Sequence, residues 1–213
     1  MTDEQLKCIV SEDNGTKSYF NSDGDRHRPD VPAIEYPDGS TEWWLNGRVH
    51  REDGPAIFRV EGYRCWYLNG KLHRVGGPAL VEPYCEEWWL NGERHRDDGG
   101  PAIENRDGKY RDGEMCWYIH GKLHRVGGPA VKHSAGGGCW LIHGIKDRRD
   151  GPALELADGC KEWWANGELH NPNGPAKEFP DGTKEWWLKG KHIEGPFVNH
   201  KQFKSYMKMK AFW

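Results

Sequence analysis

Hydrophobic and polar positions in this chain follow a short motif that predicts two strands joined by a turn. In one copy, Ser40 to Leu45 is rich in residues that favour strands and includes two adjacent tryptophans. Asn46-Gly47 follows, and this dipeptide favours a type I′ turn because both residues readily adopt a positive φ. Arg48 to Arg51 then returns as a second strand. The motif therefore predicts a β-hairpin.

The motif recurs at a period of about 23 residues. A Gly-Pro step marks each copy: Gly54-Pro55, Gly77-Pro78, Gly100-Pro101, Gly128-Pro129, Gly151-Pro152, Gly174-Pro175 and Gly195-Pro196. Proline cannot donate to a strand ladder, so we expect the chain to bend there before entering the next copy. Such a period is typical of stacked repeats. We therefore predict an all-β fold, an elongated single antiparallel sheet of stacked hairpin repeats.

The repeats divide the chain into three predicted parts. Residues 1–36 hold a degenerate repeat or cap, residues 37–197 hold seven hairpin repeats, and residues 198–213 form a basic amphipathic segment. In that segment Phe203, Tyr206 and Met207 have helical spacing among lysines. A short helix there would cap the last edge strand, or it would dock on a partner or an anionic membrane. Phe212 and Trp213 would suit either role.

A two-residue turn at Asn46-Gly47 also fixes which residues face one another. The expected cross-strand pairs are Trp44 with Val49, Trp43 with His50 and Glu42 with Arg51. The first aromatic position is tryptophan in every copy, which predicts a spine of stacked indoles: Trp43, Trp66, Trp88, Trp117, Trp140, Trp163 and Trp186. The second position varies, as a half-exposed recognition face would. We expect a partner-binding face made of Trp44, Tyr67, Trp89, Tyr118, Trp164 and Trp187.

The period, the aromatic pair before Asn-Gly and the following His and Gly resemble the MORN (membrane occupation and recognition nexus) repeat. The resemblance covers roughly residues 38–197, with a worn copy around residues 14–33. MORN units usually carry Gly-x-Gly after the turn, whereas this chain carries His-Arg-x-x-Gly-Pro-Ala. The variant is similar to one in uncharacterised phage and large-virus proteins. The resemblance implies a non-enzymatic scaffold for protein association, sometimes with lipid contacts, and a phage protein of this kind would act on a host factor.

Composition narrows the classes of function. A formal net charge of -3 gives no basic surface for a nucleic-acid duplex, so nucleic acid is not an expected partner. No apolar run is long enough to span a membrane, and the N-terminus lacks the apolar segment of a secretion signal, so we expect a cytoplasmic protein. Five of the six cysteines occupy positions filled elsewhere by Glu, Lys, Ser or Thr, which favours free thiols over disulfides.

Motifs of the common enzyme classes are absent from the sequence: there is no nucleophile elbow, His-Glu-x-x-His zinc motif, P-loop or dinucleotide fingerprint. We expect neither catalysis nor a cofactor. Cysteine and histidine are common metal ligands, and they recur at the same spacing as Cys116 with His120 and Cys139 with His143. Residues four apart on a strand lie about 13 Å from each other, too far to share an ion, so no metal site is expected. His120 and His143 replace the turn asparagine, which suggests a different turn.

The His-Arg doublets allow two interpretations. Either they form a ladder for anions, or each His packs on the cross-strand Trp while the Arg pairs with the Glu opposite. Arg74 and Arg125 should face Cys65 and Cys116 instead of glutamate, so they are the better candidates for an external anion. The complete set of candidate anion or ligand residues is Arg74, Arg125, His120, His143, Arg148 and Arg149.

The fourth and fifth copies depart most from the motif, so a discrete site is expected between residues 105 and 149. Residues 105–113 lengthen one connection, and residues 133–138 make the next one glycine-rich. The glycine-rich loop would present backbone N–H groups to an anion near Arg148 and Arg149, or it would be a flexible surface loop.

Two hypotheses follow for the function. In the first, the protein is a non-catalytic scaffold that binds another protein, or a second copy of itself, through the aromatic and charged face. In the second, it binds and sequesters a nucleotide-like small molecule, using aromatic surfaces for stacking and arginines for the anion.

Overall fold

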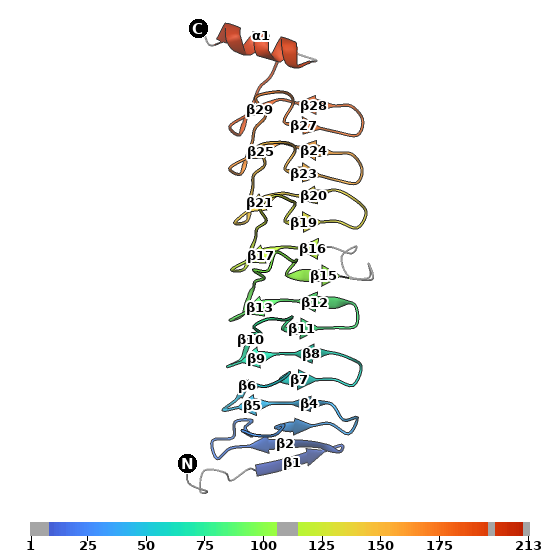
Figure 1. The fold of residues 1–213 in the computed structure, drawn as a ribbon, viewed down its shortest axis with the longest axis vertical. Coiled ribbons are helices and arrows are strands. Elements are labelled where there is room, and N and C mark those ends of the chain that lie inside the picture. The colour runs from blue at the N-terminus through green and yellow to red at the C-terminus, as the bar shows by residue number, and fades with distance from the viewer. Residues whose placement is uncertain (1–8, 106–114, 196–198, 211–213) are drawn as a thin grey trace. The chain divides into compact units, whose positions relative to one another are not determined.

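The computed structural model describes residues 9–105, 115–195 and 199–210 (Figure 1). The predictions for Cys8, for the connection at residues 106–113 and for Phe212 and Trp213 lie outside these residues. The chain forms two compact units. Unit 1 is Met1–Asp107 with Ile119–Gly121, and unit 2 is Gly108–Tyr118 with Lys122–Trp213. We number the repeats by the tryptophan at the first aromatic position, from Trp43 in repeat 1 to Trp186 in repeat 7.

In unit 1, nine strands of the long antiparallel sheet follow one another in chain order. They are β1 (Ile9–Asp13), β2 (Thr16–Phe20), β3 (Ile34–Glu35), β4 (Thr41–Glu42), β7 (Ile57–Phe58), β8 (Arg64–Cys65), β11 (Leu80–Val81), β12 (Cys85–Glu87) and β15 (Ile103–Asn105). Beside them lie separate hairpins: β5 (Trp44–Leu45) with β6 (Arg48–Val49), β9 (Tyr67–Leu68) with β10 (Lys71–Leu72), and β13 (Trp89–Leu90) with β14 (Glu93–Arg94).

Unit 2 repeats this arrangement with seven sheet strands. They are β16 (Met115–Cys116), β19 (Val131–Lys132), β20 (Gly138–Cys139), β23 (Leu154–Glu155), β24 (Lys161–Glu162), β27 (Lys177–Glu178) and β28 (Lys184–Glu185). Its hairpins are β21 (Leu141–Ile142) with β22 (Ile145–Lys146), β25 (Trp164–Ala165) with β26 (Glu168–Leu169), and β29 (Trp187–Leu188) with β30 (Lys191–His192). A further hairpin joins β17 (Tyr118–Ile119) to β18 (Lys122–Leu123), and α1 (His200–Lys210) ends the described chain.

The predicted fold class is therefore confirmed. The protein is mostly β, its long sheet is antiparallel and connected by hairpins, and the helix found in the described residues is short and C-terminal.

The chain leaves the long sheet at the first aromatic position of each repeat. In repeat 1 the backbone N–H of Trp43 donates to Ala56 O at 2.7 Å, and Trp43 O accepts from the backbone N–H of His50 at 3.0 Å. One residue thus joins two ladders. The next residue, Trp44, lies opposite Val49 in the separate hairpin, as predicted.

The predicted pairing of Glu42 with Arg51 is wrong. Glu42 belongs to the long sheet, where it lies opposite Ile34 and Ile57. Arg51 lies beyond the end of the small hairpin, and its backbone N–H donates to Tyr67 O of the following repeat at 3.0 Å. The change of ladder at Trp43 separates the two side chains, and the hairpin pattern alone gives no signal of it.

The turn of each of the seven separate hairpins has the type I′ character predicted for Asn46-Gly47. The first turn residue has a positive φ in each of the seven repeats, for example 48° at Asn46 and 49° at Lys189, and the glycine after it does too. His120 and His143 have φ values of 47° and 50°. The expectation of a different turn at these histidines is therefore wrong, because the following glycine and the hairpin register impose the same geometry.

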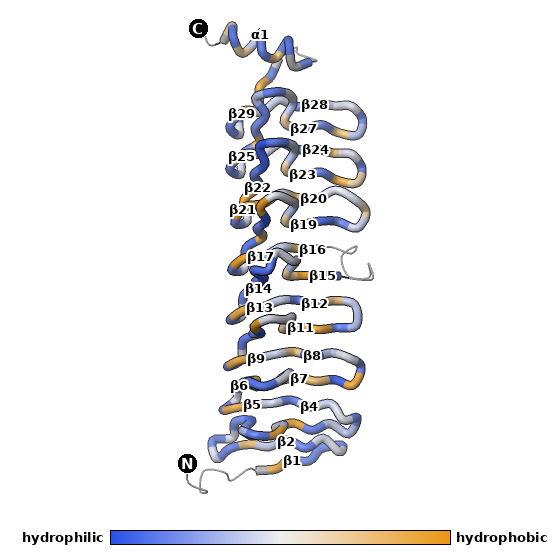
Figure 2. Tube along the Cα trace, viewed as in Figure 1, coloured by the Kyte–Doolittle hydropathy of each residue, from blue (hydrophilic) through white to orange (hydrophobic). Residues whose placement is uncertain are grey.

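The core contains few large apolar side chains, and Figure 2 shows hydrophobic positions in short stretches spread over the repeats. The alanine after each of the first six Gly-Pro steps is fully buried: Ala56, Ala79, Ala102, Ala130, Ala153 and Ala176, with Ala33 at the equivalent place in the N-terminal copy. Its backbone N–H and C=O both bond to neighbouring strands, as Ala56 does with Cys65 O and Trp43 N. A small residue is needed where the strands come together so closely.

An arginine covers the face of the first-position indole in five repeats. The guanidinium carbon lies 3.7–3.9 Å from the ring centroid in the pairs Arg51–Trp43, Arg74–Trp66, Arg96–Trp88, Arg125–Trp117 and Arg148–Trp140. In each, the same guanidinium donates to the carbonyl of the proline in the Gly-Pro step. Cation–π contacts of this kind hold these rings, and the predicted stacking of indole on indole is not found among the described residues.

The glycine of the Gly-Pro step makes room for this arginine. A Cβ atom at Gly100 would lie 2.3 Å from the guanidinium carbon of Arg96, and one at Gly54 would lie 2.9 Å from that of Arg51. In repeat 6 the arginine is replaced by Asn171, and a Cβ at Gly174 would meet its amide nitrogen at 3.4 Å, an ordinary contact. The requirement for glycine thus comes from the packed side chain.

We therefore expect Gly100→Ala to destabilise the protein by about 1–3 kcal/mol, because the methyl group displaces Arg96 from Trp88 and from Pro101 O. The matched variant Gly174→Ala should be close to neutral. Chemical denaturation of both variants tests this. Equal destabilisation would show that the glycines serve the backbone and not the arginine.

In repeats 1, 2, 3, 4 and 6, a histidine after the hairpin accepts a hydrogen bond from the next repeat. The backbone N–H of the following turn donates to the histidine Nδ1, at 3.2 Å from His143 to His124 and at 3.1 Å from Lys189 to His170. An acceptor at Nδ1 requires the neutral ring with its proton on Nε2. Burial, together with the neighbouring His143, lowers the pKa of His124. The folded protein therefore favours the neutral ring.

Because the pKa of His124 is lower in the folded state than its usual value of about 6.5, protons bind more tightly to the unfolded chain. We expect this contribution to stability to be complete above pH 6.5 and to decline as the pH falls below it. Thermal melts between pH 8 and 5 measure the decline. His124→Gln offers an acceptor that does not titrate, so its stability should fall less over this range; an equal fall in both proteins would contradict the prediction.

The C-terminal helix packs on the last repeat. Phe203 of α1 is almost fully buried, and its ring centroid lies 6.5 Å from that of Trp186. Tyr206 and Met207 pack on the same cluster, together with Ile193. Repeat 7 carries Glu194 where the arginine stands in other repeats, so the helix supplies the apolar contact that an arginine makes elsewhere.

The described cysteines are free thiols, as predicted: Cys65, Cys85, Cys116, Cys139 and Cys160. All but Cys160 are buried. Burial raises the pKa of Cys65 and of Cys85 to about 11, which keeps these thiols protonated near neutral pH. Their role is packing.

Candidate functional site

The second aromatic position is coupled to the residue two places before it. Where the position holds tryptophan, the indole Nε1–H donates to a glutamate at 2.8–2.9 Å, in the pairs Trp44–Glu42, Trp89–Glu87, Trp164–Glu162 and Trp187–Glu185. Where it holds tyrosine or leucine, the earlier residue is cysteine, in the pairs Cys65–Tyr67, Cys116–Tyr118 and Cys139–Leu141. Much of the variation at this position therefore reflects packing inside each repeat.

Glu42 shows how firmly these carboxylates are held. Burial opposes its ionisation, but hydrogen bonds from Arg59, Trp44 and Tyr36 outweigh it and keep the pKa of Glu42 below its usual value. Glu162 is similar. Burial opposes its charge, but the hydrogen bond from Trp164 and the positive charges of Lys177 and Lys146 lower its pKa. A tryptophan at the second position is thus part of a charged network inside its repeat.

The second-position rings remain half-buried, and cations lie on several of them. Arg94 lies 4.8 Å from the ring of Trp89, and Lys146 lies 4.6 Å from that of Trp164. The rings of Trp89 and Trp164 are therefore fixed before any partner arrives. These two rings, with Trp44, Tyr67, Tyr118 and Trp187, are the predicted partner-binding face, and all six are partly exposed.

A shallow groove of about 530 Å³ separates the second and third hairpins of unit 1. Two rings of the predicted face, Tyr67 and Trp89, line it. Lys71 and Glu93 contribute opposite charges, and Leu72 contributes an apolar wall. The groove therefore offers the mixture of aromatic rings and charge that protein interfaces use.

The prediction that Arg74 and Arg125 face Cys65 and Cys116 is wrong, although both arginines do lack the acid that pairs with the arginine in repeats 1, 3 and 5. Cys65 lies opposite Ile57 and Leu80 in the long sheet, not opposite Arg74. The acid that pairs with the arginine in other repeats is an aspartate two residues later, as in Arg51–Asp53 at 2.8 Å. Repeats 2 and 4 carry glycine there, and no ion pair of Arg74 or Arg125 is found in the described part of the chain. Burial lowers the pKa of Arg74.

His120 and His143 are exposed turn residues, and each pairs with a histidine of the preceding repeat. The ring centroids lie 4.6 Å apart for His95 and His120 and 4.2 Å apart for His124 and His143. Their place in the turn is accounted for by these contacts.

At the glycine-rich loop before β20, the backbone of the loop lies close to neighbouring backbone segments. A Cβ at Gly137 would lie 2.3 Å from Glu155 O, and one at Gly138 would lie 2.6 Å from Val131 O. Gly136 uses its backbone N–H for His133 O. Packing thus explains Gly137 and Gly138, and the loop residues stay apart from the pocket described next.

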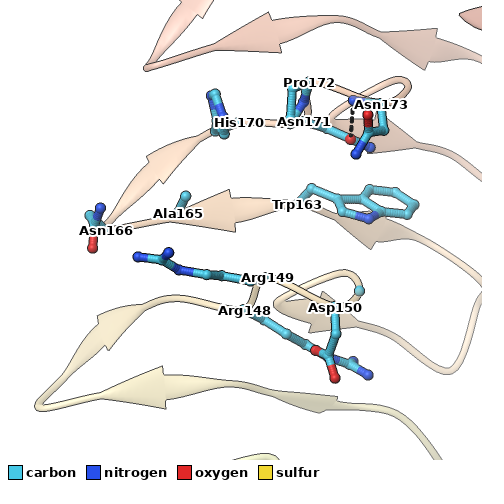
Figure 3. Close-up of a pocket in the computed structure, with 11 residues that line it drawn as sticks. Arg148, Arg149, Asp150, Trp163, Ala165, Asn166, His170, Asn171, Pro172 and Asn173 are labelled. Atoms are coloured by element: carbon cyan, nitrogen blue, oxygen red, sulfur yellow. Dashed lines mark hydrogen bonds and ion pairs between the residues drawn. The ribbon is translucent and has the colours of Figure 1, made fainter.

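A pocket of about 650 Å³ lies in unit 2 between the loop of repeat 5 and the hairpin of repeat 6 (Figure 3). One side of the pocket is lined by Arg148, Arg149, Asp150 and Gly151. The other side is lined by Trp163, Ala165, Asn166, His170, Asn171, Pro172 and Asn173. Arg148 is already engaged, by Asp150 at 3.0 Å, by Glu155 at 3.1 Å and by the Trp140 ring. Arg149 is exposed and extends toward Ala165 and Asn166.

The structure thus places Arg148 and Arg149 at one pocket, while Arg74, Arg125, His120 and His143 occupy other repeats. Most of the pocket comes from residues 163–173, beyond the stretch in which a site was expected. Two departures in repeat 6 could have signalled it. Ala165 stands where the other repeats carry Leu or Ile, and Asn171 replaces the arginine.

The chain was compared with models of known protein families and with curated proteins, and neither comparison found a match. Within the described residues, no helix is long and apolar enough to cross a membrane.

Proposed function

We propose that this protein is a non-catalytic repeat scaffold that binds another protein through the hairpin face of its repeats. The observation that carries the proposal is the groove between the second and third hairpins, where Tyr67 and Trp89 stand side by side, half-exposed. Tyrosine, tryptophan and arginine dominate the binding energy of many protein interfaces. The resemblance of the sequence to MORN repeats points to the same class of function.

Preorganisation strengthens the case for binding. The indole of Trp89 is held by Glu87 at 2.8 Å and by the Arg94 guanidinium on its ring. A ring that is already ordered loses little conformational entropy when a partner covers it, so more of the contact energy appears as affinity. The opposite charges of Lys71 and Glu93 would orient the partner. A phage or viral protein built in this way would engage a host protein, for instance one that acts in defence.

A photo-crosslinking amino acid at Lys71 tests the proposal in cells that naturally contain the protein. Lys71 is exposed in β10 and lines the groove. We expect one discrete protein adduct from this position. The control is the same amino acid at Glu61, which is exposed in the turn between β7 and β8 at the opposite end of the repeat (Figure 1). No adduct from Lys71, equal adducts from both positions, or an adduct with a second copy of this chain would contradict the proposal.

Tyr67→Ala should lower the affinity for the captured partner at least about tenfold, as hot-spot rings do. Tyr67 suits this test better than Trp89, because truncating Trp89 would also remove one of the hydrogen bonds to Glu87. Binding of the purified proteins, with a thermal melt to show that the variant is folded, gives the measurement. Unchanged affinity in a folded Tyr67→Ala variant would remove the groove from the interface.

A further inference from the structure

Repeat 6 leaves open a position that an arginine fills in five other repeats. At Trp163 the equivalent residue is Asn171, whose amide nitrogen donates to Pro175 O at 2.7 Å and so replaces the hydrogen bond of the arginine to the proline carbonyl. Asparagine is too short to cover the indole as well. No cation is found on the Trp163 ring among the described residues, and this ring lines the pocket of unit 2.

An equivalent pocket in unit 1 shows what repeat 6 has changed. That pocket is formed by Arg28, Pro29, Asp30, Val31 and Pro32 with Trp43, Leu45, His50, Arg51, Glu52 and Asp53, and its volume is about 490 Å³. Arg51 lies on its indole, 3.9 Å from the ring centroid. In repeat 6, Leu45 has become Ala165 and Arg51 has become Asn171, and the pocket is larger, at about 650 Å³. Both changes remove side-chain volume beside the same ring.

The charge of the pocket has changed in the same direction. The unit 1 pocket is lined by two arginines and three acids, so negative charge is in excess. In the unit 2 pocket, Pro172 and Asn173 stand where the unit 1 pocket has Glu52 and Asp53. Arg149 stands where the unit 1 pocket has Pro29. Two arginines and one aspartate remain, so positive charge is in excess. Asp150 is paired with Arg148, which leaves Arg149 as the charge that faces solvent.

The polar groups suit a planar heterocycle. Figure 3 shows the Trp163 ring at one end of the pocket and the Arg149 side chain directed toward Asn166 at the other. The side-chain amides of Asn166 and Asn173 line the space, and each offers both donors and an acceptor. The Asn171 amide also lines it but is already engaged, because it donates to Pro175 O and accepts from the backbone N–H of Asn173. An acid for a bound guanidinium is missing, because Asn173 replaces the aspartate that pairs with the arginine in repeats 1, 3 and 5. A cation is therefore the poorer match.

We infer that this pocket binds a planar heteroaromatic anion of the nucleoside monophosphate class, with its ring stacked on Trp163 and its anionic group at Arg149. The ring takes the place that the arginine side chain has in the other repeats. A volume of about 650 Å³ lies within the range of ligand pockets in proteins. The site is separate from the hairpin groove of unit 1, so the two proposals stand or fall independently.

Isothermal titration calorimetry of the full chain with AMP, GMP, CMP and UMP at low salt tests the inference. We expect at least one of them to bind with a Kd below about 1 mM. The nucleoside of the nucleotide that binds lacks the anion, and ribose 5-phosphate lacks the heteroaromatic base. Each should bind at least about tenfold more weakly than that nucleotide or fail to bind. Absence of binding by all four nucleotides, or binding of the guanidinium compound agmatine in preference to them, would overturn it.

Restoring the residues of the other repeats should close the pocket without harming the fold. The double variant Asn171→Arg with Asn173→Asp rebuilds the arginine and its aspartate beside Trp163, as in Arg51–Asp53. We expect it to melt at or above the wild-type temperature and to lose nucleotide binding. Ala165→Leu is a second, independent variant that narrows the same pocket and should also reduce the affinity. Full affinity in either folded variant would place the ligand elsewhere.

Arg149→Ala should weaken binding about tenfold or more, since it removes one charge-assisted contact from an exposed residue. Arg64→Ala is the matched control, because Arg64 is also an exposed arginine but lies on β8 in unit 1. An equal loss of affinity in both variants would indicate non-specific attraction of the anion and would overturn the assignment to this pocket.

Discussion

The contact between an arginine guanidinium and the first-position indole is the interaction on which the repeat depends. In repeat 3, Arg96 lies 3.9 Å from the Trp88 centroid, donates to Pro101 O and pairs with Asp98. One side chain therefore connects the strand, the Gly-Pro loop and the aspartate before it. The glycine of the loop follows from this contact, because any Cβ there would occupy the space of the guanidinium. A polar chain can bury rings in this way because cations cover the first-position indole in five of its repeats.

The backbone connects each repeat to the next through positions that carry little side-chain volume. The alanine after Gly-Pro is fully buried between strands, and the histidine after the hairpin accepts a hydrogen bond from the following turn. Contacts of this kind involve nearest neighbours, which is how repeat proteins gain stability. A departure in one repeat is therefore tolerated by the others. This explains how repeat 6 can give up its arginine, and how repeat 7 can replace it with Phe203 of the helix.

The two proposed sites use the two aromatic positions in different ways. At the second position the ring is fixed by an acid within its repeat and leaves a half-exposed surface, as with Trp89 and Glu87. At the first position an arginine covers the ring in five repeats, and the proposed ligand pocket is in repeat 6, where asparagine replaces the arginine. One protein can hold both proposed sites, since the hairpin groove lies in unit 1 and the ligand pocket lies in unit 2.

The sequence alone determined the repeat, the hairpins, the type I′ turns and the free thiols, because these depend on local chemistry such as positive φ at Asn-Gly. It also indicated that departures from the motif matter. Only the tertiary structure showed that the chain changes ladder at Trp43, which separates Glu42 from Arg51 and assigns the arginine to the indole. Likewise, Ala165 and Asn171 look like minor substitutions until the fold brings both beside Trp163 and Arg149. Contacts between neighbouring repeats create that pocket, and a pattern read along a single strand does not contain them.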